Sequence, residues 1–177
     1  MRFLLAFSLV CGSAWANVPS VCFSPDGNCD EKLWTFLQSA KKSLDVAVFD
    51  LTHEKIVHEI LVASRRVPVR VVVDRRQSKG PHSLVSTLVK AKVPVRFGRQ
   101  RGVMHHKFAI VDGTALETGS FNFTDSASRR NRENQLYVAE PAIVGAYQKE
   151  FERLWEEGVP ADRPSKTNRR TASRRDR

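Results

Sequence analysis

Residues 104–124 read MHHKFAIVDGTALETGSFNFT and contain the most informative pattern in the chain. Two spaced motifs lie within this stretch: H-x-K-x4-D, formed by His105, Lys107 and Asp112, and G-S-x-N, formed by Gly119, Ser120 and Asn122. Apolar residues surround both motifs, so the motifs belong to regular secondary structure within a core rather than to a polar linker.

The two apolar runs of this stretch are separated by Asp112-Gly113. An Asp-Gly pair between two strand-like runs is typical of a two-residue β-hairpin loop. We therefore expect one strand over residues 106–111 and a return strand over residues 115–118.

A two-residue loop also fixes which side chains lie opposite one another in the hairpin. Lys107 would then face Thr118, and His105 would face Ser120, with Cβ atoms about 4.5–5.5 Å apart. Because side chains alternate along a strand, His105 and Lys107 would share one face and His106 would point away. The sequence thus predicts that an imidazole, an ammonium group and a hydroxyl converge at the open end of the hairpin.

These groups suit a phosphate substrate. The Lys107 ammonium is a compact positive charge for phosphoryl oxygens. Ser120 and Asn122 can donate hydrogen bonds to the same oxygens as charge develops. His105 can act as a nucleophile or as a general acid and base near neutral pH. We interpret the stretch as a phosphate-handling site.

At these residues the sequence resembles the phospholipase D superfamily. HHKFAIVD carries the superfamily signature and ETGSFNFT its extension, and the layout is similar over about residues 18–158. The full H-x-K-x4-D pattern occurs once, whereas lipid-acting members usually carry two copies. The chain is most similar to the small bacterial Nuc-type endonucleases, which have a single motif.

The resemblance implies a mechanism and a role for each residue. His105 would attack phosphorus and form a phosphohistidine, and a second His105 would come from the other subunit of a homodimer. Glu133 would accept a hydrogen bond from the Nδ1–H group of the histidine and so fix the orientation and tautomer of the ring. Asp112 is part of the signature, but its place in the turn favours a structural role over direct chemistry. The mechanism requires no metal and no cofactor, and we interpret Asp45, Asp50 and Asp74 as structural.

The remaining sequence alternates between strand-like and helix-like patterns. We expect strands over 18–24, 44–49, 69–73, 93–97 and 135–138, and helices over 30–41, 54–64, 83–91 and 141–157. This alternation favours an α/β fold, a three-layer α/β/α sandwich with a mixed, mostly parallel sheet, as in phospholipase D-like proteins. Ligands of such sheets bind beyond the carboxyl ends of the parallel strands, where the motif hairpin would open.

The charge balance favours a polyanionic partner. The chain has 177 residues, 41% of them hydrophobic, and a formal net charge of +10. Such a balance suits one globular domain that binds nucleic acid or an anionic membrane surface. We expect four arginines beside the motif to bind the substrate backbone: Arg75, Arg76, Arg101 and Arg132. Phe121 and Phe123 are expected to pack in the core rather than to stack on bases.

Both ends of the chain differ in composition from the expected domain over residues 17–160. Residues 1–16 have a basic start, an apolar run and an A-x-A cleavage site, which are typical of a secretory signal peptide. Residues 161–177 are rich in arginine and lack aromatic residues, so we expect a basic disordered tail. Export to the periplasm or medium would favour a disulfide between Cys22 and Cys29. No stable membrane span is expected in the mature chain.

The sequence therefore predicts an exported, metal-independent phosphodiesterase. The favoured activity is non-specific endonuclease cleavage of DNA, with RNA as a further substrate, by a homodimer. Two alternatives remain open. One is a phospholipase D or phosphatidyl transferase that acts on lipids, and the other is a non-catalytic nucleic-acid-binding protein.

Overall fold

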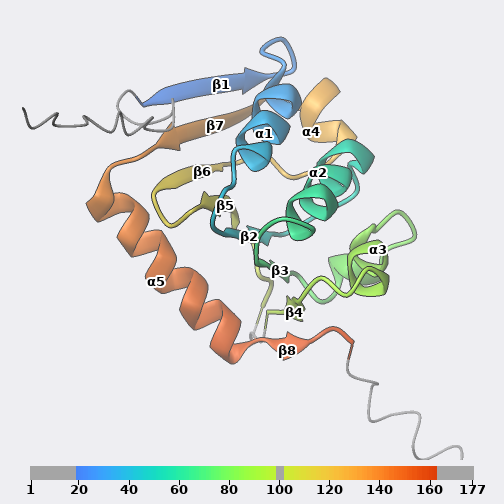
Figure 1. Ribbon diagram of the computed structural model, residues 1–177. Coiled ribbons are helices and arrows are strands. Elements are labelled where there is room, and N and C mark those ends of the chain that lie inside the picture. The colour runs from blue at the N-terminus through green and yellow to red at the C-terminus, as the bar shows by residue number, and fades with distance from the viewer. Residues whose placement is uncertain (1–18, 99–101, 163–177) are drawn as a thin grey trace, which may run out of the picture.

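The computed structural model describes residues 19–98 and 102–162. The expected signal peptide, Arg101 and all but the first two residues of the expected tail lie outside these ranges. The described residues form a sheet in the strand order β1-β7-β6-β5-β2-β3-β4-β8 (Figure 1). The strands are β1 (Ser20–Ser24), β2 (Leu44–Val48), β3 (Val69–Val73), β4 (Val95–Phe97), β5 (Lys107–Val111), β6 (Ala115–Gly119), β7 (Glu133–Val138) and β8 (Val159–Pro160).

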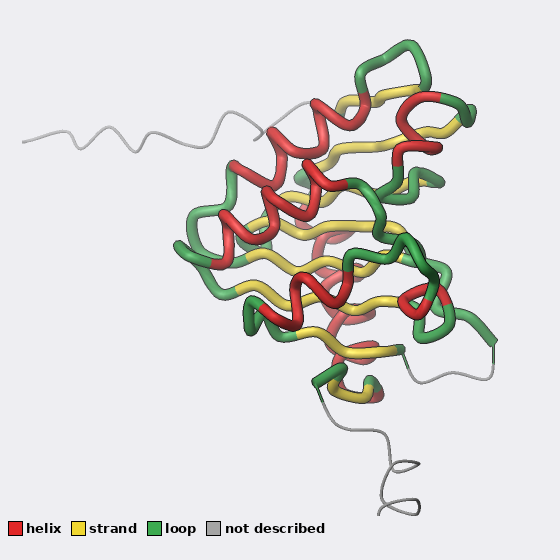
Figure 2. The backbone as a smooth tube through the Cα atoms, turned by 90° about the vertical axis from the view of Figure 1, so that its right-hand side faces the viewer, coloured by secondary structure: helices red, strands yellow, loops and turns green. Residues whose placement is uncertain are grey.

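Helices cover both faces of this sheet. They are α1 (Cys29–Gln38), α2 (Glu54–Ser64), α3 (Val85–Lys90), α4 (Asp125–Arg129) and α5 (Pro141–Glu157), with a short 3-10 turn, η1 (Gln77–Lys79). Figure 2 shows α1, α2 and α3 on one side of the strands and α5 behind them. The three-layer α/β/α sandwich is therefore confirmed.

Helices α1, α2, α3 and α5 form where the apolar periodicity predicts them, whereas the short helix α4 was not predicted. In α1 the buried side chains Leu33, Phe36 and Leu37 recur at helical spacing and pack on the sheet. In α5 a proline at the first turn supplies a fixed φ without losing a needed N–H. Helix α5 turns Val144, Phe151 and Leu154 toward the sheet and leaves Ile143 exposed.

The sheet is mixed, as expected, but its parallel part is smaller than we predicted. Only β2–β3 and β3–β4 pair in parallel. The five other pairs are antiparallel: β1–β7, β2–β5, β4–β8, β5–β6 and β6–β7. Helical crossovers through α2 and α3 account for the parallel pairs, whereas a tight turn joins the antiparallel pair β5–β6.

The motif hairpin has the expected turn but a different register. Asp112 and Gly113 both have positive φ, of 56° and 66°, and the Thr114 N–H donates to the Val111 carbonyl at 3.0 Å, as in a type I′ turn. However, Val111 pairs with Ala115 and Phe108 pairs with Thr118, so Thr114 is an extra residue in the return strand. The predicted opposition of Lys107 to Thr118 is therefore wrong by one position.

The predicted disulfide is present. Cys22 and Cys29 are bonded, with Cα atoms 5.6 Å apart, and they join β1 to the first turn of α1. Because the two residues are close in sequence, the bond closes a small loop and staples the start of the domain locally.

Candidate active site

His105 and Lys107 lie at the start of β5, against the end of the neighbouring strand β2. The rings of His105 and Phe49 are 4.5 Å apart between centroids, and the Lys107 Nζ lies 5.0 Å from the centre of the Phe49 ring. The Lys107 ammonium also donates to the His105 carbonyl at 2.7 Å. As expected, the two side chains share one face. His106 lies on the other face, where its Nε2 is 3.1 Å from Glu150 on α5.

The surroundings of His105 and Lys107 lower the pKa of both side chains. The His105 side chain is exposed, and the Lys107 side chain is buried beneath it. Loss of solvent lowers the pKa of His105, and the charge of Lys107 lowers it further, against the opposing effect of Asp74. Burial also lowers the pKa of Lys107, opposed by Glu133 and by Asp50. The imidazole is thus biased toward the neutral form, which is the form that can act as a nucleophile.

Ser120 and Glu133 meet at the adjacent ends of β6 and β7. The Ser120 hydroxyl donates to Glu133 Oε2, and Asn131 Nδ2 donates to Glu133 Oε1 at 2.9 Å. Among the described residues both carboxylate oxygens are thus occupied within the chain, and neither accepts from His105. The expected orienting bond from Glu133 to His105 is not made. Instead Phe49 packs against the ring, and Glu133 holds Ser120 in place.

The backbone brings Asn122 to the same edge of the sheet. The loop after β6 is joined to the segment after β2, because Phe123 N donates to Asp50 O at 3.1 Å and Thr52 N donates to Phe123 O at 3.0 Å. Asn122 Oδ1 is buried without a hydrogen-bond partner among the described residues. Phe121 and Phe123 are fully buried, so they pack in the core as predicted.

Asp112 lies at the opposite end of β5 from His105. Its Oδ1 accepts hydrogen bonds from the backbone N–H groups of Lys41, Lys42 and Ser43 at 3.0, 2.7 and 3.0 Å. The carboxylate therefore ties the hairpin turn to the loop before β2. This position supports the structural role of Asp112 and not direct chemistry, so Asp112 is not one of the catalytic residues.

Three of the four expected substrate-binding arginines are described, and all three are exposed: Arg75, Arg76 and Arg132. Arg75 and Arg76 follow β3 at the edge that carries His105. Arg132 directly precedes Glu133. The fourth, Arg101, lies outside the described residues. The sequence expectation for these positions remains a prediction about substrate binding.

Two aspartates that we had interpreted as structural lie at the site itself. Asp74, directly after β3, accepts from Met104 N at 3.0 Å and from Arg76 N at 2.8 Å, so it anchors the residue before His105. Asp50 follows β2 after one residue and accepts from Gln77 Nε2 at 3.2 Å. Their position after the carboxyl ends of two parallel strands was the signal that could have identified them. The contacts of Asp74 are nevertheless structural, as expected, because it accepts from backbone N–H groups. Asp45 is also structural as expected, because it pairs with Arg70 at 2.7 Å.

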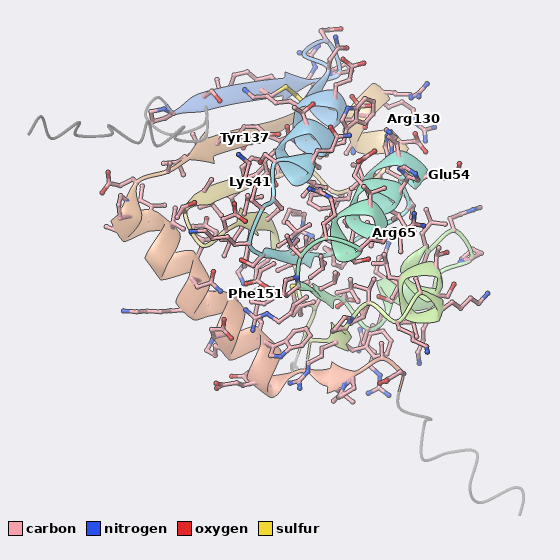
Figure 3. The ribbon with its side chains drawn as sticks, viewed as in Figure 1. Lys41, Glu54, Arg65, Arg130, Tyr137 and Phe151 are labelled. Carbon is pink, nitrogen blue, oxygen red and sulfur yellow. A yellow bond between two sulfur atoms is a disulfide. The ribbon has the colours of Figure 1, made fainter. Side chains whose placement is uncertain are left out.

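A cleft of about 700 Å³ opens beside Asn122. Its walls come from the segment after β2, the loop before α3 and the loops around α4. Figure 3 labels two of its lining residues, Glu54 at the start of α2 and Arg130 after α4. Most of the side chains that line it are polar: Asp50, Thr52, Glu54, Gln77, His82, Ser83, Asn122, Thr124, Asp125, Ser126, Arg130 and Asn131. The cleft continues the site toward α2 and α4.

Residues 19–98 and 102–162 contain neither a metal-ligand cluster nor a membrane-spanning helix. No three His, Cys, Asp or Glu side chains gather there in a way that could hold a metal ion. Within the same ranges, no helix has the length and apolar character needed to cross a bilayer. A second H-x-K spacing, at His53 and Lys55, lies at the start of helix α2, and Ile60 stands where the motif requires aspartate. It is not a second copy of the motif.

Comparison with known proteins agrees with this geometry. The family model described as "Cardiolipin synthase, PLD-like domain" matches residues 33–155. The mitochondrial cardiolipin hydrolase of Xenopus laevis is 45% identical over 131 residues, which cover 73% of this chain and 62% of that protein. A phospholipase D of Rickettsia conorii is 30% identical over 129 residues, 72% of this chain and 64% of that one.

A solved structure shares the whole architecture. The phospholipase D family member Nuc from Salmonella typhimurium superposes with a TM-score of 0.78 and 27% identity, over 82% of this chain and 99% of that one. The chain spans about three-fifths of the length of the curated relatives that it matches, so their full activities do not transfer directly. With the motif residues at one sheet edge and the family model matched over residues 33–155, the chain belongs to the phospholipase D superfamily.

Proposed function

We propose that the protein hydrolyses nucleic acid, with DNA as the main substrate and RNA as a further one, through a phosphohistidine at His105. The observation that carries the proposal is the fixed pair of an exposed His105 ring and a buried Lys107 ammonium, both packed on Phe49. The exposed arginines beside the site and the net charge of +10 favour a polyanionic chain as substrate.

The chemistry follows from these groups. Lys107 and Asn122, with Ser120, hold the phosphate and offset its negative charge. A His105 ring nitrogen attacks phosphorus, the P–N bond forms, and the bond to the leaving oxygen breaks. A second histidine gives its proton to that oxygen. Water then attacks the phosphohistidine, its proton returns to the second histidine, and His105 is released.

One chain supplies one copy of the full motif, so we assign the second histidine to an identical subunit. Such a homodimer would place two His105 side chains about a two-fold axis.

We also propose that the protein is exported. The disulfide between Cys22 and Cys29 supports an oxidising compartment, and a secreted chain that does not begin at Asn17 would contradict the proposed cleavage site.

The direct test is plasmid cleavage in excess EDTA by the purified protein and two variants. We expect His105→Ala to lose activity by on the order of 10³-fold or more, because the nucleophile is gone. His106→Ala is the matched control, since its ring lies on the other face, and it should retain most activity. Cleavage abolished by EDTA, or retained in His105→Ala, would overturn the proposed mechanism.

A lipid phosphodiester is the second candidate substrate. It is favoured by the matched family description and by the name of the Xenopus relative, both of which refer to cardiolipin. Hydrolysis of anionic phospholipid vesicles by the wild type, lost in His105→Ala, together with intact plasmid under the same conditions, would replace the nucleic-acid proposal with this one.

A further inference from the structure

His53 is a buried histidine that the proposed mechanism does not use. It directly precedes helix α2 as its N-cap residue, and only 6% of its surface is exposed. Both ring nitrogens are buried, and neither has a hydrogen-bond partner among the described residues. Because buried polar groups in folded proteins are almost always paired, an unpaired ring at this position requires an explanation.

Carboxylates from two other helices face the ring of His53. Its Nε2 lies 3.5 Å from Asp30 Oδ2 on α1 and 3.7 Å from Asp125 Oδ1 on α4. These separations are long for hydrogen bonds of a neutral ring but suit an ion pair. A protonated ring would be a cation between two anions and would attract both. Histidine changes charge between pH 5 and 8, so the link between α1 and α4 through His53 is strongest in acid.

The charged side chains next to these groups leave the two carboxylates as the partners of the ring. Arg129 Nε lies 3.8 Å from Asp125 Oδ1, so it shares that exposed oxygen with the ring and does not replace it. On α2 itself, Lys55 pairs with Glu59 at 2.5 Å. Glu54 lines the cleft beside the expected phosphate site. The positive charge that can bridge α1 and α4 is therefore that of the imidazolium.

The same histidine is joined to the segment that carries Asn122. The backbone N–H of His53 donates to the Phe123 carbonyl at 2.9 Å. Two residues after Phe123, Asp125 begins α4 and faces the His53 ring. The Asn122 Oδ1 is buried without a hydrogen-bond partner among the described residues, so the position of this side chain depends on how its segment is held. His53 holds that segment by its backbone and, when its ring is charged, through Asp125 as well.

We propose that His53 is a pH-sensitive positioning residue whose charged ring clamps Asp125 to Asp30 and thereby holds Asn122 in place for phosphate binding. This inference rests on the proposed phosphodiesterase function. Asn122 is expected to bind the phosphate both before and during the reaction, so the clamp acts on KM more than on kcat. The clamp is closed in acid and opens as the ring loses its proton.

The test compares the KM of the wild type and His53→Gln for bis(p-nitrophenyl) phosphate at low and high pH. Glutamine is uncharged throughout, and the ratio of the two KM values cancels the effects of other titrating groups. We expect the variant to have a KM about fivefold higher than the wild type at about pH 5.5, and less than about twofold higher at about pH 8. A purely structural role of His53 would give the same ratio at both pH values.

His58→Gln is the matched control, because His58 is an exposed histidine of the same helix that contacts Glu59 and not the site. Its KM should equal that of the wild type at both pH values. The double variant Asp30→Asn, Asp125→Asn removes both partners of the ring and should reproduce the pH-dependent ratio of His53→Gln. It also provides the test if His53→Gln does not fold, which thermal unfolding of each variant shows.

Nuclear magnetic resonance tests the clamp without catalysis. In the wild type, the backbone amide signals of residues 122–126 should shift between about pH 5 and 8 with the same midpoint as the ring of His53. This titration should be absent in His53→Gln and present in His58→Gln.

The outcomes separate the clamp from the proposed function. A KM ratio that is the same at both pH values, or amide signals that titrate unchanged in His53→Gln, would overturn the clamp and leave the phosphodiesterase function intact. If the wild type cleaved neither bis(p-nitrophenyl) phosphate nor plasmid while the amide signals titrated as expected, the proposed function would be overturned, and with it the role of the clamp in phosphate binding.

Discussion

Lys107 and Glu117 are buried ionisable residues of the same hairpin. Nearby groups favour the charged form of Lys107, whereas burial disfavours the charged form of Glu117. Lys107 lies at the edge of the site, donates to the His105 carbonyl and is attracted by two carboxylates. Glu117 is fully buried in β6 beside Tyr137, and neither of its oxygens has a hydrogen-bond partner among the described residues. Burial raises the pKa of Glu117 well above its usual range, so the core holds this carboxyl protonated.

This shift predicts a specific pH dependence of stability. The folded state retains the Glu117 proton while the unfolded state loses it near the ordinary pKa of 4.5, so stability falls as pH rises above that value. Glu117→Gln has no proton to lose. Its stability advantage over the wild type should be near zero at pH 4 and grow by up to about 1.4 kcal/mol per pH unit above pH 5. Urea unfolding of both proteins across this range measures the difference, and a constant difference would contradict the prediction.

At the scale of one element, local sequence predicts the turn of the motif hairpin and the faces of its side chains, but not its register. The Asp-Gly turn formed as expected, because both residues tolerate positive φ, and alternation placed His105 and Lys107 on one face. The register shifted by one residue at Thr114, and the sequence contains no signal for that extra residue. Strand β6 pairs with β5 on one side and with β7 on the other, and the pairing with β7 joins segments that no short-range pattern relates.

The same hairpin allows a test of the motif aspartate. Asp112→Ala would leave three backbone N–H groups without their acceptor and should cost about 2–3 kcal/mol in the free energy of unfolding. Asp112→Asn keeps an acceptor and tolerates the positive φ, so it should lose less. Urea unfolding and kcat of the folded protein measure the two effects separately. Unchanged stability with lost kcat would indicate instead that Asp112 takes part directly in the chemistry.

At the scale of the whole molecule, the proposed second histidine makes the assembly part of the site. We expect the active species to sediment as a dimer and its specific activity to fall on dilution. An excess of His105→Ala chains mixed with wild type should inhibit beyond simple dilution, because mixed dimers contain one His105. An equal excess of His106→Ala should not inhibit. An active species that is strictly monomeric would exclude a shared site.

The sequence by itself determined the superfamily, the three-layer sandwich and the residues His105, Lys107, Ser120 and Asn122 at one edge. Spacing along a strand and apolar periodicity are local properties of the sequence, so tertiary contacts do not change what they predict. The tertiary structure alone decided that most strand pairs are antiparallel and that Glu133 holds Ser120 rather than His105. It also placed Asp50 and Asp74 at the site and an acidic cleft beside it. These features depend on which strands and loops become neighbours, and contacts between distant segments of the chain set that arrangement.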